Sequence, residues 1–500
     1  MIPNQDSQAV ELERETHLTV ADLPDEVSEA KALEHLVDVE VPESLKDPVP
    51  IGELGHRRFT GGEFWGHVPA FADVDSETFL DPAFQNRHSV TGADVLRKTV
   101  QDLADESFYA DVEAGLAQAP MNIRISPYLL SLIDWEDPYS DPIRIQFLPV
   151  ASTHQPDHPR LSLDSLHEKD DSPTPGLVHR YPDKALFLPL DVCPVYCRFC
   201  TRSYAIGGST DSVEKDGYKP RTARWEAAFA YLASRPEVED VVVSGGDAYM
   251  LPARRLREIV GTLLAIPHIR RVRIASKGPA VMPMKILRDE AWTDALVEMC
   301  DRGRDLAKEV CLHTHFNCTR EITDITREAM NTLFRRGVKV RNQSVLVRGV
   351  NDDPEEMVDL VKRLSWMNVQ PYYVYQHDMV KGVEDLRTRL EDTMEVERYV
   401  RGATAGFNTP TFVTDVPGGG GKRDLHSLDF YDEVTGVSVY RSPAVDEDKF
   451  YLYYDPLHLL PEEGRRRWAD PAEHDRMVKE AILAAGVGDL EPAEPTERLA

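Results

Sequence analysis

Cysteine and basic side chains are both scarce in this chain. Six cysteines occur among 500 residues, too few for a disulfide scaffold, so we expect free thiols and a reducing compartment such as the cytoplasm. Lys and Arg number 57 against 86 Asp and Glu, which gives a formal net charge of −29. This excess of negative charge argues against a nucleic-acid partner, because phosphate-binding surfaces need clustered Lys and Arg.

Long apolar stretches are also missing. No apolar run reaches the roughly 18 residues of a membrane span, so we expect no membrane partner. The first residues, MIPNQDSQAVELERE, show no basic patch followed by an apolar core, so no secretory signal is expected.

Three of the six cysteines lie within the segment CPVYCRFCTR (193–202), at the spacing C-x3-C-x2-C. They are Cys193, Cys197 and Cys200, and they follow an apolar run that predicts a buried strand. Thiolates favour zinc or iron–sulfur clusters, and a structural zinc would need a fourth ligand that no nearby Cys or His supplies. Three thiolates can instead hold three irons of a cubane cluster and leave the fourth iron open.

This cysteine pattern after a strand resembles the radical S-adenosylmethionine (SAM) enzymes. The wider segment HRYPDKALFLPLDVCPVYCRFCTR (179–202) resembles the lysine 2,3-aminomutase family, and the resemblance extends over about residues 179–422. It implies a [4Fe–4S] cluster on the three cysteines, SAM on the open iron, and pyridoxal 5′-phosphate (PLP) as a further cofactor. It also implies an α/β fold, a partial (β/α)6 barrel of the radical SAM type that is open on one side.

Apolar patterns divide the chain into four parts. We expect an acidic arm over 1–60, a mainly helical region over 61–178, the barrel over 179–425 and a C-terminal extension over 426–500. Within the helical region, helices are expected over 91–103 and 107–118, and the segment 141–150 is expected to be a strand. In the extension, strands are expected over 437–441 and 449–454 and a helix over 471–485.

Strand and helix patterns alternate from residue 184 onward, which predicts parallel strands covered by helices. The expected strands cover 185–190, 240–244, 271–275, 310–314, 338–346, 371–375 and 411–414. The expected helices cover 223–234, 252–265, 285–300, 326–336 and 354–366. Catalytic residues then belong at the carboxyl ends of the strands.

The segment DVPGGGGK (415–422) follows the last expected strand. Four glycines predict a pliable loop, and Lys422 at its end could form a Schiff base with a carbonyl compound. A phosphate-binding loop would need Ser or Thr after the lysine, but Arg423 stands there. The family resemblance implies that Lys422 is the catalytic lysine that binds PLP.

Side chains that could donate hydrogen bonds to a phosphate are expected just before the strand that leads to the cysteines. Arg and Lys both bind phosphate, and the resemblance implies that Arg180, Tyr181 and Lys184 bind PLP. The family usually has an arginine where Lys184 stands. A solvated basic turn is the structural alternative.

The segment SGGD (244–247) ends the second expected strand, where two glycines allow a close approach to a ligand. Its aspartate could accept a hydrogen bond from an ammonium or a ribose. A plain turn, or buried polar residues with protein partners, would be the structural alternative. The resemblance implies SAM-binding positions at Gly245, Gly246, Asp247, His315 and Gln343.

The resemblance also implies substrate-binding roles for Arg202, Asp378 and Asp415. Arg202 would bind the α-carboxylate, and the two aspartates would bind a side-chain ammonium. Two converging carboxylates need a cation between them, which favours a basic substrate, lysine first and arginine second. An ion pair, a helix cap and a surface turn are the structural alternatives.

These positions predict an isomerase that interconverts L-lysine and L-β-lysine through a 5′-deoxyadenosyl radical. The alternatives are an arginine 2,3-aminomutase, another radical SAM isomerase or epimerase acting on an amino acid, and a non-catalytic binding protein. An electron donor such as flavodoxin or ferredoxin is the expected partner.

The chain departs from the family at its zinc site. Family members often carry an intersubunit zinc, with one cysteine after GVND and three near the C-terminus. Here Asp353 follows GVND (349–352) and no cysteine follows Cys318, so we expect no zinc and leave a homo-oligomer open. Cys300, Cys311 and Cys318 are expected to be ordinary buried thiols.

Overall fold

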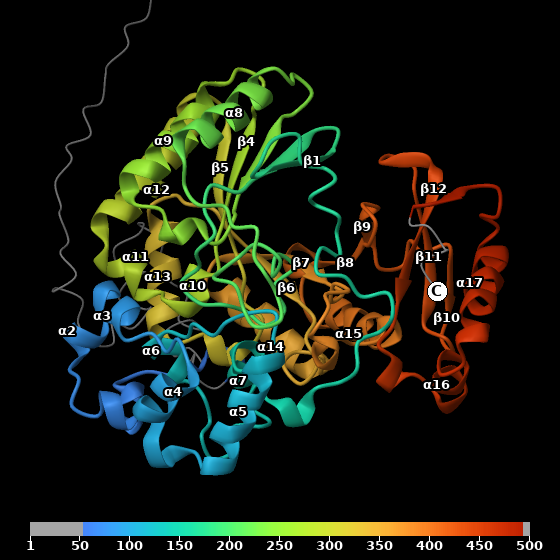
Figure 1. Ribbon diagram of the computed structural model, residues 1–500. Coiled ribbons are helices and arrows are strands. Elements are labelled where there is room, and N and C mark those ends of the chain that lie inside the picture. The colour runs from blue at the N-terminus through green and yellow to red at the C-terminus, as the bar shows by residue number, and fades with distance from the viewer. Residues whose placement is uncertain (1–53, 494–500) are drawn as a thin grey trace, which may run out of the picture. The chain divides into compact units, whose positions relative to one another are not determined.

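A nine-stranded sheet forms the centre of the computed structural model, which describes residues 54–493 (Figure 1). Most of the expected arm over 1–60 therefore lies outside the described residues. The strands follow the chain order and are β1 Leu177–Tyr181, β2 Lys184–Phe187, β3 Asp240–Val243, β4 Arg271–Ala275, β5 Glu309–Thr314, β6 Val340–Val345, β7 Val369–Tyr375, β8 Thr411–Val416 and β9 Gly421–Asp424.

Strands β2 to β8 are parallel, and β1 and β9 are antiparallel additions at the two ends. No pairing joins β1 to β9 within the described residues, so the barrel is open on one side. The expected open α/β barrel is confirmed. The resemblance implied six strands, and the parallel part of the sheet has one more because β8 continues it.

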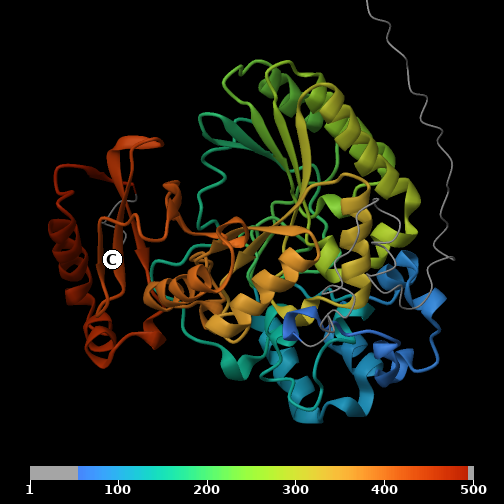
Figure 2. The same cartoon turned by 180° about the vertical axis from the view of Figure 1, so that it is seen from behind.

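Helices cover the outer face of the parallel strands, as Figures 1 and 2 show. They are α8 Thr222–Ala233, α9 Ala253–Ala265, α10 Gly278–Val281, α11 Met284–Arg288, α12 Glu290–Asp305, α13 Asp324–Arg335, α14 Pro354–Trp366 and α15 Leu390–Ala403. Each long helix buries one apolar face; in α9, for example, Leu256, Ile259 and Leu263 are fully buried. The helix expected over 285–300 is two helices, because Asp289 caps a new start by accepting from the Trp292 backbone N–H.

The N-terminal part of the described chain is helical, as expected. Its helices are α2 Ser76–Phe79, α3 Pro82–Arg87, α4 Ala93–Val100, α5 Glu106–Gln118, α6 Pro127–Leu130 and α7 Pro142–Phe147. The strand expected over 141–150 was wrong, since α7 occupies most of it. Asp141 accepts from the backbone N–H groups of Ile143 and Arg144, and Pro142 stands at the first helical position, a strong start signal.

The C-terminal part forms a second, smaller sheet with its own apolar core. Its strands are β10 Phe430–Asp432, β11 Val437–Ser442, β12 Asp446–Tyr454 and β13 Glu491–Pro492, accompanied by α16 Glu462–Trp468 and α17 Pro471–Ala485. The expected strands and helix here are confirmed. Val416 of β8 and Met379 belong to this second core, so it packs against the sheet's last parallel strands.

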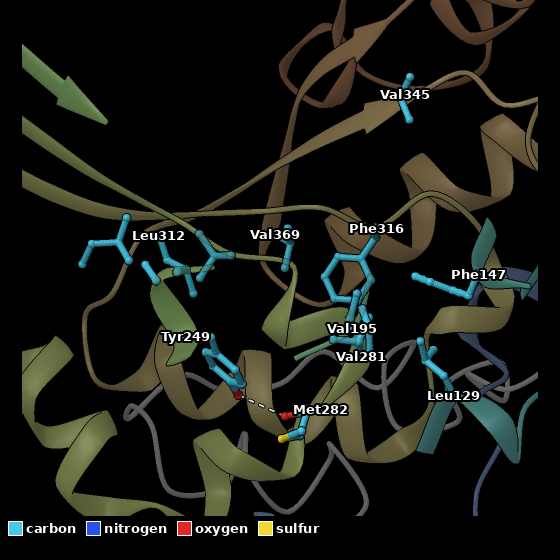
Figure 3. Close-up of a cluster of buried hydrophobic side chains, with 14 of the residues drawn as sticks. Leu129, Phe147, Val195, Tyr249, Val281, Met282, Leu312, Phe316, Val345 and Val369 are labelled. Carbon is cyan, nitrogen blue, oxygen red and sulfur yellow. Dashed lines mark hydrogen bonds between the residues drawn. The ribbon is translucent and has the colours of Figure 1, made fainter. Parts of the chain in front are cut away.

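The main core lies between the sheet and its helices, and Figure 3 shows part of it. Leu312 of β5 and Val369 of β7 are buried there, and the Tyr249 hydroxyl donates to the Met282 carbonyl over 3.0 Å. Val195, from the cysteine segment, belongs to the same cluster. The segment that carries the cysteines is thereby anchored in the core. None of the helices within residues 54–493 combines the length and apolar character that a bilayer crossing requires.

Candidate active site

A cavity of about 730 Å³ fills the inside of the barrel, lined by residues from β1 to β9. Every residue predicted for the site except Gly245 lies on its wall. Those residues are Cys193, Cys197, Cys200, Gly246, Asp247, His315, Gln343, Arg180, Tyr181, Lys184, Lys422, Arg202, Asp378 and Asp415. Residues far apart in sequence thus meet in one place, as the parallel strand order requires.

Three free thiols face this cavity from the cysteine segment. Backbone bonds hold the segment, because Tyr196 N–H donates to the Arg124 carbonyl over 3.0 Å and Arg198 N–H to the Gln146 carbonyl over 2.9 Å. Burial raises the pKa of Cys197 to about 12 and that of Cys193 well above its ordinary value. Such thiols ionise when a metal centre compensates their charge.

The donor set fits an iron–sulfur cluster better than a single ion. Among residues 54–493, no three His, Cys, Asp or Glu side chains converge where one metal ion could bind. In a cubane cluster each cysteine binds a different iron, so its three thiolates need not converge on one point. The cysteine segment therefore presents the ligands that such a cluster requires.

The SGGD turn is pressed against the chain that leads into Cys193. A Cβ on Gly246 would lie 2.3 Å from the Val192 carbonyl oxygen, and Gly245 has a φ of +95°, so neither position tolerates a side chain. Asp247 accepts from the backbone N–H groups of Tyr249 and Lys277, each over 2.8 Å. Its carboxylate thus also holds the turn in place.

His315 and Gln343 also line the cavity wall. The His315 ring stacks on Phe199 with a centroid distance of 5.5 Å, and its buried Nε2 has no hydrogen-bond partner within the described chain. Burial lowers the pKa of His315 well below its usual value, so the ring is neutral and free to bind a ligand atom. Gln343 Nε2 lies 2.7 Å from Nδ1 of His313, and the Tyr375 hydroxyl donates to its Oε1 over 3.0 Å.

Lys422 lies on a strand, whereas the sequence predicted a loose loop. Residues 417–420 form a turn, and β8 and β9 pair so that Asp415 stands directly opposite Lys422. Lys422 Nζ donates to Asp415 Oδ2 over 2.6 Å, and its backbone N–H donates to the Tyr181 hydroxyl over 2.9 Å. Burial alone would lower the pKa of the Lys422 ammonium, but the Asp415 carboxylate raises it well above its usual value.

Arg180 and Lys184 stand close to this hairpin, on β1 and β2. Arg180 Nε donates to Asp171 Oδ2 over 2.7 Å, and a Cβ on Gly419 of the turn would lie 3.7 Å from the same nitrogen. Lys184 Nζ sits 3.8 Å from the centre of the Tyr181 ring, and burial followed by the nearby Lys422 lowers its pKa. Arg180, Lys184 and Lys422 thus bring three cationic groups to this end of the cavity, where Asp171 and Asp415 pair with two of them. Such groups can bind a phosphate.

The two aspartates predicted to bind substrate share one part of the cavity. Asp378 Oδ1 and Asp415 Oδ1 are both buried without a hydrogen-bond partner in the described structure. Burial and then the Asp415 charge raise the pKa of Asp378 to about 8. A cation placed between them would satisfy both oxygens.

Arg202 makes a contact that the sequence did not predict. Its Nε and Nη2 donate to the two carboxylate oxygens of Glu168, over 2.8 and 2.6 Å. Glu168 comes from the irregular segment before β1, and no motif marks it. His313 and Tyr375 also escaped prediction, although both lie on expected strands and point into the cavity.

Comparison with known proteins agrees with this geometry. Residues 187–361 match the model of the Radical SAM superfamily. L-lysine 2,3-aminomutase of Clostridium subterminale is 41% identical, over 70% of this chain and 79% of the relative. L-lysine 2,3-aminomutase of Fusobacterium nucleatum subsp. nucleatum is 36% identical, over 82% of this chain and 96% of the relative.

Two further matches are weaker. Glutamate 2,3-aminomutase of Clostridioides difficile is 34% identical, over 68% of this chain and 75% of the relative. A solved radical SAM methyltransferase from Sphaerobacter thermophilus is 16% identical, over 48% of this chain and 68% of that chain, with a TM-score of 0.30. This likeness is too slight to bear on function. Given the site and its relatives, the chain belongs to the lysine 2,3-aminomutase family of the radical SAM superfamily.

Proposed function

We propose that this protein is an isomerase that interconverts L-lysine and L-β-lysine by moving the amino group between C2 and C3. The observation that carries the proposal is the pair of buried, unpartnered carboxylate oxygens of Asp378 and Asp415. A side-chain ammonium is the ligand that this pair selects, and a second carboxylate, as in glutamate, would be repelled. The named lysine relatives support the same substrate.

The residues present fit the three cofactors that the family uses. Cys193, Cys197 and Cys200 would hold the [4Fe–4S] cluster, and the orphaned Nε2 of His315 and the amide of Gln343 would contact SAM. Lys422 would hold PLP, with Arg180, Tyr181 and Lys184 around its phosphate. When bound, the cluster with SAM supplies an organic radical, and PLP stabilises the unpaired electron during nitrogen migration.

The chain's own groups would hold the substrate at both ends. Arg202 would bind the α-carboxylate through its remaining N–H groups, and the two aspartates would bind the ε-ammonium. Fixing both ends limits rotation about the carbon chain, which keeps C3 at one position in the cavity. Gly245, Gly246 and Asp247 would shape the wall beside the cluster.

A low-potential donor such as flavodoxin or ferredoxin is the proposed source of the reducing electron. The free thiols of the cysteine segment fit the reducing cytoplasm proposed for the protein.

Competition between amino acids tests the proposal. Anaerobically reconstituted protein is supplied with SAM, PLP and dithionite, and is offered lysine, arginine and glutamate together, with products identified by mass spectrometry. β-Lysine as the main product supports the proposal, and β-arginine would move the substrate while keeping the mechanism. A protein that forms 5′-deoxyadenosine but no β-amino acid would not be an aminomutase.

Lys422→Ala provides the matching control. The variant should lose the PLP that borohydride fixes covalently to the wild type, while its cluster absorbance stays unchanged, because the cysteines are untouched. PLP fixed to the variant at the wild-type level would place the reactive lysine elsewhere.

A further inference from the structure

Two of the arginines that line the cavity, Arg180 and Arg202, are held by one short segment outside the sheet. This segment, residues 162–172, precedes β1 and is called the arginine-binding segment below. Figures 1 and 2 show the teal chain leading into β1 running outside the sheet. Leu166 and Glu168 reach from it onto the cavity wall.

The contacts to Arg202 are the strongest of these. Glu168 receives two parallel hydrogen bonds from the guanidinium and a third, over 3.0 Å, from the Tyr204 hydroxyl. Its side chain is 6% exposed and that of Arg202 is 20% exposed. A bidentate pair removed from water fixes the plane of the guanidinium, whereas a single bond would let it rotate.

The same segment also holds the second arginine. Arg180 donates to Asp171 Oδ2 over 2.7 Å and to the Leu166 carbonyl. At its start, Ser162 N–H donates to the Met379 carbonyl and Lys381 N–H to the Ser162 carbonyl, each over 3.2 Å, directly after Asp378. The segment therefore touches Arg202, Arg180 and the chain that carries Asp378.

The segment is itself rigidly built around Glu168. The Asp164 carboxylate accepts from the backbone N–H groups of Glu168 and Lys169 over 2.9 and 3.1 Å, and the Ser172 hydroxyl donates to the Glu168 carbonyl over 2.8 Å. His167, just before Glu168, has a φ of +55°. A side chain held this way can orient a partner rather than follow it.

We infer that Glu168 is a positioning residue for Arg202, which it aims at the α-carboxylate of the substrate. The inference rests on the proposed function, since it assigns the carboxylate to Arg202. Glu168 uses two of the five N–H donors of the guanidinium and leaves the others for a ligand. Glu168 acts on the substrate only through this arginine.

A comparison of two ligands shows whether Glu168 acts through Arg202 or affects the whole cavity. L-Lysine has the carboxylate, and pentane-1,5-diamine carries the same two amino groups without it. Binding of each to the PLP-loaded protein is measured from the change in PLP absorbance. Glu168→Gln keeps the size of the side chain but loses its charge and one acceptor oxygen.

Glu168→Gln should weaken lysine binding about tenfold and change diamine binding less than about twofold, because only the carboxylate contact depends on Arg202. In an Arg202→Met background the same substitution should change lysine binding less than about twofold. Glu168→Asp, which keeps the charge, should recover part of the affinity. Asp170→Asn, an exposed carboxylate of the same segment, should change neither ligand.

Equal losses for both ligands, or the same lysine loss in the Arg202→Met background, would overturn the inference. Tighter lysine binding by Glu168→Gln would also overturn it, because the uncompensated charge of Arg202 would then matter more than its orientation. If Glu168→Gln does not fold, as thermal unfolding would show, the two-ligand comparison is made with Glu168→Asp and read by the same criteria. A wild-type protein that binds neither ligand would instead contradict the proposed function.

Discussion

Among the residues proposed to bind substrate, Asp378 is the one whose charge state changes near neutral pH. Its carboxyl lies in the cavity beside Asp415, and burial together with that neighbour raises its pKa to about 8. Below this pH the free protein holds Asp378 as the neutral acid, which attracts an ammonium less strongly than the carboxylate does. Lysine recognition is therefore expected to improve as the solution becomes mildly alkaline.

The first prediction concerns this pH dependence. Because kcat/KM reports the free protein, its value for lysine should rise up to about tenfold per pH unit toward pH 8, then level off until the lysine side chain loses its proton near pH 10. Asp378→Asn should remove the rising limb and lower kcat/KM at pH 9 by at least about thirtyfold. A rising limb that persists in Asp378→Asn would assign the titration to another group.

Lys422 and Asp415 act on each other in the protein without cofactor. Their 2.6 Å ion pair keeps Lys422 protonated, since Asp415 raises the pKa of the ammonium well above its usual value despite burial. Only an unprotonated amine attacks a carbonyl carbon. If Lys422 binds PLP as proposed, Asp415 should therefore slow the capture of PLP, although the proposal also gives it the substrate ammonium to bind.

The second prediction follows from this opposition. Asp415→Asn should bind PLP covalently faster at pH 7.5, by about tenfold or more, because burial then lowers the pKa of Lys422 without a compensating carboxylate. The same variant should discriminate less between lysine and glutamate. The rate is followed by PLP absorbance after mixing, and a rate equal to or below that of the wild type would show that the ion pair does not control capture.

At the scale of single elements, a tight turn and a hairpin position parts of the candidate site. The SGGD turn packs so closely on the chain before Cys193 that a Cβ on Gly246 would lie 2.4 Å from the Val192 nitrogen. The turn and the cysteine segment are therefore expected to move together. Glycine at this position serves close approach rather than flexibility.

The third prediction tests that contact. Gly246→Ala should displace the chain ahead of Cys193, lower the free energy of unfolding by about 2–4 kcal/mol and reduce the iron bound per chain. Gly261→Ala is the matched control. Gly261 lies in helix α9, and the nearest atom to a Cβ there would be Arg302 Nη1 at 3.9 Å, so the position has room for a methyl group. It should leave iron content unchanged and stabilise α9 by up to about 1 kcal/mol. Full iron content in Gly246→Ala would show that the contact does not position the cysteines.

Periodicity predicted most barrel elements because their apolar faces are set by local sequence. The strands from β2 to β8 and helices such as α9 and α14 lie where their patterns indicate. The pattern failed where capping and turn chemistry decide: Asp141 with Pro142 begins a helix in a segment with strand-like composition. It also missed β9, because glycine-rich sequence reads as a loop although Asp415 and Lys422 pair across a hairpin.

At the scale of the whole molecule, the order of the strands brings most of the candidate site residues together. The arginine-binding segment lies outside the sheet, so strand order does not account for its place at the site. That the cysteines, Lys422 and the aspartates line one cavity was predictable, because each follows or lies beside a strand end in a recognisable motif. The position of Glu168 was not predictable, because it depends on a contact with Arg202, 34 positions later and beyond strands β1 and β2. Local sequence carries no signal for such a pairing.

The net charge of −29 adds a further element of selection at this scale. An acidic protein attracts cations over the range of the Debye length, about 8 Å at physiological ionic strength. This field would favour the same basic amino acid that the two cavity aspartates are proposed to bind.

The central claim is that the amino group of lysine moves from C2 to C3 within one molecule held at both ends. The most direct measurement is a crossover experiment with an equal mixture of L-[2-¹⁵N]lysine and L-[3-¹³C]lysine, turned over anaerobically and analysed by mass spectrometry. The account predicts β-lysine that carries either ¹⁵N at C3 or ¹³C at C3, but not both in one molecule. Doubly labelled β-lysine in a quarter of the product, or no β-lysine at all, would contradict it.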